Sequence, residues 1–267
     1  MVGTKLFGNL WAVILGGSSG FGLATAVKLA SHGMNLVIVY RETAASQKEF
    51  KEKCRVIEIE NNISIQLFNI NALDAESRTR MIGEISKSIP PDSIKLLLHS
   101  IARGNLKPLT TGGDDAGELS GEDIQSTIYA MGSSLLDWTR AIAKAKLFHH
   151  DARVVGLSSE GAHKYWKGYA AVSMAKASLE SLVTYMAVEF CGQGIKTNLI
   201  QAGVTQTPSM EKIPGSKELM EISLRRNPMG RITKTGDVAN VVYLLCMDES
   251  SWINGALIHV DGGEHCC

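Results

Sequence analysis

Residues 11–22 read WAVILGGSSGFG, and this stretch decides the fold. Its first five residues, Trp11–Leu15, are apolar, as in a buried β-strand. Glycines follow at the spacing Gly-x-x-x-Gly-x-Gly, and a helical stretch, Leu23–Leu29, comes directly after them. Glycine lets the backbone turn tightly and approach a ligand, and the amino end of a helix attracts negative charge. The stretch therefore predicts a strand, a phosphate-binding turn and a helix, which together begin a dinucleotide-binding site.

Short β-branched runs alternate with helical periodicity along the rest of the chain. Several runs, such as Leu36-Val37-Ile38-Val39, are apolar throughout, which is typical of parallel strands covered on both faces. The predicted strands are 11–15, 35–40, 64–70, 94–99, 153–157, 196–200 and 256–260, and the predicted helices are 22–31, 44–53, 75–88, 125–145, 170–191 and 235–247. We expect one α/β domain over residues 1–267, a Rossmann-type doubly wound parallel sheet of about seven strands with helices on both faces.

Two segments interrupt this alternation. Residues 104–121 carry five glycines around Asp114-Asp115, and residues 204–231 carry three prolines and a short helical patch at 216–224. Both segments follow a predicted strand, so they lie over the edge where such sheets bind ligands. Long loops in a compact domain are usually lids, binding loops or disordered. We predict that both are substrate loops.

Composition excludes several classes of protein. The formal net charge is zero, so nothing indicates a nucleic acid or an anionic membrane as partner. No run approaches the roughly 18 apolar residues of a membrane helix, and Met1–Leu10 does not resemble a signal peptide. Five scattered cysteines argue against a disulfide framework and for a reducing cytoplasm. The closing His265-Cys266-Cys267 has no second ligand pair at zinc spacing, so we expect no metal site.

The end of the second predicted strand bears on the choice of cofactor. An acidic residue here would bind the two ribose hydroxyls of NADH and repel a 2′-phosphate. The strand instead ends Val39-Tyr40-Arg41-Glu42, and Arg41 can form a charge-assisted pair with the 2′-phosphate of NADPH. Glu42 can fill the ribose role one or two residues late. NADPH is therefore the preferred cofactor, and NADH remains the alternative.

Tyr169 and Lys176 are the candidate catalytic pair. They are seven residues apart, about two turns of a predicted helix that also carries Tyr165, so we expect them on one face. A lysine near a phenol stabilises the phenolate and can hold the nicotinamide ribose. The phenol can then donate to a substrate oxygen that gains negative charge. In a chain with a dinucleotide turn, this pair predicts a reductase.

On these motifs the chain resembles the short-chain dehydrogenase/reductase family over essentially its full length. The matching residues are the Gly16, Gly20 and Gly22 turn, Ser158-Ser159, Lys176, Ala202-Gly203 and Val260-Asp261-Gly262-Gly263. The usual Tyr-x-x-x-Lys motif would place tyrosine at 172, where this chain has Val172. The spacing Tyr169-x6-Lys176 is instead similar to the enoyl-acyl carrier protein reductase branch, as are His99-Ser100-Ile101-Ala102 and the run at 176–180. The glycine turn is similar to a type associated with NADPH.

The resemblance implies further site residues. Those implied to contact the cofactor are Gly16, Ser18, Ser19, Gly20, Phe21, Gly22, Arg41, Asn69, Ile70, Ser100, Ile101, Ala102, Lys176, Gly203, Val204, Thr205 and Thr207. Tyr165, Tyr169 and Met210 are implied to contact the substrate. Ser159 either binds the substrate oxygen or caps the strand end, and Tyr165 is either cavity wall or a spare proton donor. The usual asparagine is absent from residues 124–136, and Ser133 or Ser134 is its candidate replacement in a proton relay.

The displacement of the tyrosine from 172 to 169 also has a chemical explanation. In ketone reduction the proton donor must lie beside the carbon that receives the hydride. In enoyl thioester reduction the hydride goes to the β-carbon, and the negative charge appears on the thioester oxygen, farther along the conjugated system. A tyrosine about one helical turn from the usual position 172 suits this more distant oxygen. The resemblance thus implies an NAD(P)H-dependent, homotetrameric reductase of enoyl thioesters on acyl carrier protein, in fatty acid or related acyl biosynthesis. A 3-oxoacyl or carbonyl reductase and a non-catalytic nucleotide-binding protein are the alternatives.

Overall fold

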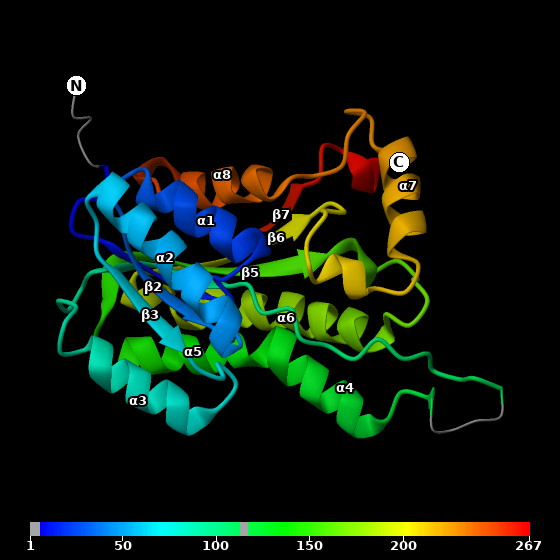
Figure 1. Cartoon of the computed structure of the whole chain (residues 1–267), viewed down its shortest axis with the longest axis horizontal. Coiled ribbons are helices and arrows are strands. Elements are labelled where there is room, and N and C mark those ends of the chain that lie inside the picture. Colours follow the sequence, from blue (N-terminus) through cyan, green and yellow to red (C-terminus); the bar gives the residue numbers. More distant parts are fainter. Residues whose placement is uncertain (1–5, 113–116) are drawn as a thin grey trace.

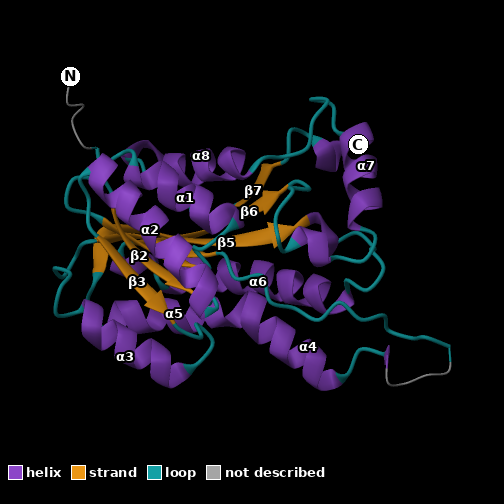
Figure 2. Cartoon of the chain, in the orientation of Figure 1, coloured by secondary structure: helices purple, strands orange, loops and turns teal. Residues whose placement is uncertain are grey.

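Seven parallel strands form one sheet through the centre of the molecule (Figures 1 and 2). The computed structural model describes residues 6–112 and 117–267, so Asp114-Asp115 of the first predicted substrate loop lie outside the described residues. The strands are β1 (Trp11–Leu15), β2 (Asn35–Tyr40), β3 (Ile65–Asn69), β4 (Ile94–His99), β5 (Phe148–Ser159), β6 (Ile195–Ala202) and β7 (Leu257–Val260). Their spatial order is β3-β2-β1-β4-β5-β6-β7. The predicted Rossmann-type sheet is confirmed.

Helices cover both faces of the sheet (Figure 1). One layer is α1 (Gly20–Ala30), α2 (Ala44–Asn61) and α8 (Thr235–Leu245), and the other is α3 (Ala75–Ile85), α4 (Gly121–Ile128), α5 (Ser134–Lys144) and α6 (Ala170–Glu189). In β1, Ala12 and Ile14 pack with the first layer, whereas Val13 and Leu15 pack with the second. Both faces of each central strand are therefore buried from solvent, which explains the apolar runs in the sequence.

The strand order reverses between β1 and β4. From this point the chain winds outward in both directions, because β1 pairs with β2 on one side and with β4 on the other. In open α/β sheets the ligand crevice lies at such a reversal, beyond the carboxyl ends of the strands. The helix α7 (Ser216–Arg226) lies past the ends of β6 and β7, outside the two layers (Figure 1). The topology thus places the second predicted substrate loop at the ligand edge.

Most element bounds lie within three residues of the predictions, and the larger differences are at α2, β5 and residues 204–231. Helix α2 continues to Asn61, beyond the predicted end at 53. Only a narrow stripe at Phe50, Cys54 and Ile57 is buried, so the apolar periodicity of its later turns is weak. Strand β5 begins at Phe148, five residues before the predicted start at 153. The segment at 204–231 is not simply a loop, since it contains a 3₁₀ turn, Met210–Lys212, and α7. Within the described residues, no helix has the length and apolar character needed to cross a membrane.

The predicted single helix at 125–145 is wrong in one respect. A π turn, Tyr129–Ser133, separates α4 from α5. Gly132 lies in this turn and faces α6, where an added Cβ would be 3.1 Å from the carbonyl oxygen of Ala175. Periodicity read from the sequence cannot detect one extra residue in a turn, because the apolar stripe on either side still repeats at helical spacing.

A cluster of charged side chains lies at the amino ends of the central strands, away from the ligand edge. Arg153 donates two hydrogen bonds to the carboxylate of Asp151, at 2.6 and 3.0 Å, and Lys95 donates a third at 2.7 Å. Lys196 also pairs with Asp151. Burial opposes ionisation of Asp151, but the hydrogen bonds from Arg153, Lys196 and Lys95 outweigh it and hold the pKa of this carboxyl well below its usual range. One carboxylate therefore neutralises cations from three neighbouring strands.

Candidate active site

A cavity of about 740 Å³ lies at the carboxyl edge of the sheet, between the glycine turn and α7. Nearly all of the predicted site residues line it, although they come from seven separate stretches of the chain. Those present are Gly16, Ser18, Ser19, Gly20, Phe21, Arg41, Ile70, Ser100, Ile101, Ala102, Ser159, Tyr165, Tyr169, Lys176, Gly203, Val204, Thr205, Thr207 and Met210. Gly22, which is buried, and Asn69, which is exposed, do not line it.

The glycine turn fits the pyrophosphate of a dinucleotide. Gly16 has a φ of +81°, and an added Cβ would lie 2.4 Å from the carbonyl oxygen of Ser100. At Gly22 a Cβ would lie 2.3 Å from the carbonyl oxygen of Gly16, so this glycine serves the packing of α1 against the turn. Ser19 is the N-cap of α1 and makes no side-chain capping hydrogen bond, which leaves the first amide groups of the helix without a side-chain acceptor. This is the arrangement that an anion completes.

The residues after β2 form the adenosine end of the cavity. Ser18 donates a hydrogen bond to Glu42 at 2.9 Å, so the acidic side chain lies against the glycine turn. Asn69 uses its amide on the backbone of Glu42, accepting from the nitrogen and donating to the oxygen, both at 3.0 Å. Arg41 lines the cavity and makes no ion pair with any described residue. Asn69 thus shapes the site through Glu42, whereas Arg41 is available to a ligand.

Lys176 lies deep in the site on α6. It is only 5% exposed, and its Nζ donates to the carbonyl oxygen of Leu157 at 2.7 Å. Burial lowers the pKa of Lys176 to about 8, and the nearby charge of Glu180 opposes this effect. Lys176 therefore carries its charge at neutral pH and loses it under mildly alkaline conditions.

Tyr169 faces the same cavity from the start of α6. Its hydroxyl donates to Oγ of Ser159, with the two oxygens 3.4 Å apart. Burial raises the pKa of Tyr169, and the hydrogen bond to Ser159 works in the opposite direction. The phenol is consequently protonated at neutral pH and can act as a hydrogen-bond or proton donor.

The prediction that one helix carries Tyr165, Tyr169 and Lys176 is wrong, although Tyr169 and Lys176 do line the same cavity. Helix α6 begins at Ala170, so Tyr169 is its N-cap residue and Tyr165 precedes the helix. Gly168, with a φ of +73°, breaks the backbone between them. Tyr165 is 89% exposed at the cavity mouth, which suits a contact with an entering ligand rather than proton transfer beside Lys176.

The serines predicted to replace a proton relay do not line the cavity. Ser134 is fully buried, lies 2.8 Å from Nε2 of His99 and donates to the carbonyl oxygen of Ala130. Burial lowers the pKa of His99 to about 3, with a further contribution from the charge of Lys176, so His99 is neutral. The Ser134 hydroxyl therefore supports the end of β4 instead of reaching the ligand.

A polar network at the far end of the cavity was not predicted. Arg226 of α7 donates to Glu264 at 2.8 Å and pairs with Glu160, which also pairs with Lys164 at 2.7 Å. The indole of Trp166 donates to the carbonyl oxygen of Pro214 at 2.8 Å. These contacts tie α7 and its preceding loop to the end of β5. Their members come from distant segments, so no local sequence pattern could have revealed them.

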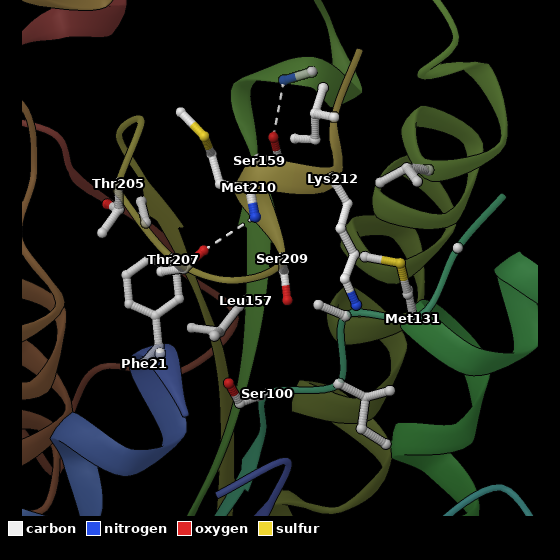
Figure 3. A pocket seen from close by; sticks show the side chains of 18 of the residues that line it. Phe21, Ser100, Met131, Leu157, Ser159, Thr205, Thr207, Ser209, Met210 and Lys212 are labelled. Atoms are coloured by element: carbon white, nitrogen blue, oxygen red, sulfur yellow. Dashed lines mark hydrogen bonds between the residues drawn. The ribbon is translucent and has the colours of Figure 1, made fainter. Parts of the chain in front are cut away.

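Figure 3 shows the middle of the cavity. Thr207 accepts a hydrogen bond from the backbone nitrogen of Met210 at 3.2 Å, which fixes the start of the 3₁₀ turn beside Phe21. Met131 and Met210 both line the cavity, and the side chain of Lys212 extends into it beside Met131. Adaptable methionine side chains thus share the middle of the cavity with polar groups such as Ser159 and Lys212.

The comparison with known families agrees with this geometry. The family model described as enoyl-(acyl carrier protein) reductase matches residues 16–265. The chain belongs to this family. Like the relatives whose names state a nicotinamide cofactor, this family member is an NAD(P)H-dependent oxidoreductase.

Individual relatives of this enoyl reductase family member differ in cofactor and substrate. It is 32% identical to the NADH-dependent enoyl-[acyl-carrier-protein] reductase FabI of Aquifex aeolicus over 65% of this chain and 63% of that protein. It is 28% identical to the NADPH-dependent FabI of Staphylococcus aureus strain MRSA252, over 93% and 92% of the two chains. It is also 27% identical to a galactitol 2-dehydrogenase of Cereibacter sphaeroides, over 94% and 93%.

Solved structures support the fold of this family member. The crystal structure of the NADH-dependent enoyl-[acyl-carrier-protein] reductase of Aquifex aeolicus superimposes with a TM-score of 0.83, over 98% of both chains. The sequences are 24% identical over this superposition. The agreement therefore extends across the whole sheet and both helical layers.

Proposed function

We propose that the protein reduces the C2–C3 double bond of an enoyl thioester carried on acyl carrier protein, in fatty acid or related acyl biosynthesis. The position of the phenol carries this proposal. At 172, where ordinary short-chain reductases place tyrosine, the chain has Val172, which is 3% exposed and lines the cavity. The phenol comes instead from Tyr169, at the very start of α6, with its hydroxyl on Ser159. It thus lies farther from Lys176 along the helix, as an oxygen remote from the reduced carbon requires.

Tyr169, Ser159 and Lys176 have separate roles in this proposed reaction. When bound, the reduced nicotinamide supplies a hydride to the β-carbon of the substrate. Tyr169, held by Ser159, donates to the thioester oxygen as negative charge gathers there, and its raised pKa keeps the proton in place beforehand. Lys176 binds the nicotinamide ribose through its ammonium group and favours the charge that develops near the phenol. Solvent then protonates the α-carbon.

Steady-state oxidation of NADPH with two short thioesters tests the proposal. Crotonyl thioester carries the double bond, whereas acetoacetyl thioester carries a ketone in the same place. We expect turnover of the crotonyl substrate to exceed that of the acetoacetyl substrate by at least about tenfold in kcat/KM, a difference of roughly 1.4 kcal/mol in transition-state binding. A preference for acetoacetyl thioester would overturn the proposal.

A 3-oxoacyl or carbonyl reductase is the second candidate. It is favoured by the hydrogen bond between Tyr169 and Ser159, because two hydroxyl groups meeting at one point can bind a carbonyl oxygen. The same pair of assays decides between the candidates. A longer series of C4 to C12 enoyl thioesters then defines which chains the apolar walls at Met131 and Met210 accept.

We infer that NADPH is the preferred cofactor, and Arg41 provides the test. Replacing Arg41 with alanine should lower kcat/KM for NADPH by about 10- to 100-fold, the worth of a hydrogen bond to a charged group, and leave NADH nearly unaffected. Lys48, exposed on α2 and outside the cavity, is the matched control for loss of a nearby positive charge. Equal losses with both cofactors would instead indicate that Arg41 supports the fold of the site.

We further infer a homotetramer in the cytoplasm, as the family resemblance implies. Large apolar side chains are exposed on the single chain at Tyr185 and Val188 of α6 and at Trp252, near β7. A contact between subunits would bury these side chains. Light scattering on the purified protein measures the assembly directly, and a monomer at micromolar concentration would contradict the inference.

A further inference from the structure

Three consecutive residues at the end of β5 are each held by a side chain from residues 169–180. The carbonyl oxygen of Leu157 accepts from Lys176 at 2.7 Å, and the hydroxyl of Ser159 accepts from Tyr169 at 3.4 Å. Between them, the hydroxyl of Ser158 donates to Oε1 of Glu180 at 2.5 Å. Two of the three holding residues are the proposed catalytic pair, and Glu180 is the third.

Glu180 holds both ends of the segment that leaves β5. Its other oxygen, Oε2, lies 2.8 Å from Nε2 of His163. The carboxylate therefore bridges Ser158, inside the cavity wall, and His163, on the surface. Ser159, which orients Tyr169, lies between these two anchors. The side chain of Glu180 is only 18% exposed, so its bonds are partly shielded from water.

We propose that Glu180 is a positioning residue for the reaction, which fixes the Ser158–His163 segment and places a negative charge one helical turn from Lys176. The proposal rests on the proposed reductase function for its kinetic readout. Glu180 lies four residues after Lys176, about one turn farther along α6, so the two side chains share a helix face. It acts through Ser158 and Lys176 rather than on the substrate.

The charges around Lys176 support this role. Burial lowers the pKa of Lys176 to about 8, and Glu180 counteracts the fall. Of the other titratable groups near Lys176, His99 of β4, whose pKa is lowered to about 3, interacts with its charge, and Tyr169, whose pKa is raised, lines the same cavity. Both are neutral near pH 7. Loss of the Glu180 charge should therefore let Lys176 deprotonate at a lower pH, so that functions of the ammonium group disappear earlier as pH rises.

The change Glu180→Gln tests the charge while preserving the shape of the side chain. We expect the alkaline limb of the kcat/KM profile to move to lower pH by about one unit, the low end of the effect of a neighbouring opposite charge. The affinity for NADPH, measured by cofactor fluorescence without substrate, should also begin to fall at a pH about one unit lower than in the wild type. An alkaline limb and a binding profile that both match the wild type would overturn the proposal.

Two further variants separate charge from hydrogen bonding. Ser158→Ala removes the hydrogen bond to Glu180. We expect it to lower kcat by about tenfold at every pH, the worth of one hydrogen bond, and to leave the alkaline limb of the kcat/KM profile at the same pH. Glu180→Asp keeps the negative charge on a shorter side chain, so it should also lower kcat without moving the alkaline limb. This variant tests the proposal even if Glu180→Gln does not fold. Wild-type rates in both would overturn the positioning role. Glu189→Gln, an exposed change on the same helix, is the control.

The design distinguishes failure of this inference from failure of the proposed function. If the wild type reduces neither thioester, the reductase proposal fails, yet the pH dependence of NADPH binding still reports on Glu180 and Lys176. If the wild type is active and Glu180→Gln behaves identically to it, only the inference about Glu180 fails.

Discussion

Replacing Tyr169 with phenylalanine should reduce kcat for enoyl thioester reduction by about 10²- to 10³-fold, the usual effect of removing one donor to a developing oxyanion. The phenol is the group placed to donate to the substrate oxygen, since its hydroxyl already meets that of Ser159 in the cavity. The ring itself remains, so the packing against Val172 and the fold are retained. NADPH affinity should change little, because the proposed contacts of the cofactor come from Lys176 and the glycine turn. Single-turnover reduction and cofactor fluorescence measure the two quantities separately.

Tyr165→Phe is the matched control for this change. Tyr165 lines the same cavity but is 89% exposed and lies before α6, so its hydroxyl should be dispensable within about twofold. Full activity in Tyr169→Phe, together with a large loss in Tyr165→Phe, would transfer the catalytic role to Tyr165 and contradict the proposed mechanism.

Replacing Asp151 with asparagine should lower the free energy of unfolding by about 3–5 kcal/mol, the cost of leaving buried charges without their partner. Asp151 accepts from Lys95 and Arg153 and pairs with Lys196, and both Lys95 and Arg153 are at most 2% exposed. Denaturant unfolding monitored by circular dichroism gives the quantity directly. Kinetic constants of the folded fraction should stay near wild type, since the cluster lies at the opposite end of the sheet from the cavity.

The pH dependence of this loss follows from the lowered pKa of Asp151. A carboxyl whose pKa falls on folding contributes stability at pH values above its unfolded pKa, about 4, and loses that contribution as pH decreases. The difference between wild type and Asp151→Asn should therefore be full at pH 7 and shrink under acid conditions. Glu52→Gln, which breaks an exposed pair with Arg55, is the control and should barely move the unfolding midpoint. A difference that grew on acidification would contradict the assignment.

The central strands were predictable because their chemistry is uniform. The predicted bounds of β1, β2 and β4 match the structure, since each strand is mostly apolar and almost entirely buried. β5 was predicted too short because three polar residues, His149, His150 and Asp151, follow its first residue, and Asp151 belongs to the charged cluster. Tertiary contacts, rather than a local pattern, extend this strand.

The site was predictable where a motif joins residues that are close in sequence. The glycine turn and Lys176 fall in this class, and both lie on the cavity. The start of α6 at 170 was predicted, but the placement of Tyr165 and Tyr169 on the same helix was wrong, because the left-handed turn at Gly168 is a single-residue event that a helical pattern does not reveal. The ion pairs of Arg226 with Glu160 and Glu264 could not be predicted from the sequence either, since they join segments that only the folded chain brings together.

The π turn at Tyr129–Ser133 has a consequence for sequence comparison. One extra residue in a helical turn rotates everything after it by about 100° relative to everything before it. A relative with an uninterrupted α-helix here would be one residue shorter, and a gapless alignment would pair its buried positions with surface positions of α5. A single gap placed between 129 and 133 would restore the match of Trp138 and Ile142, both fully buried, to their counterparts. Evolutionary trees built from this region depend on placing that gap correctly.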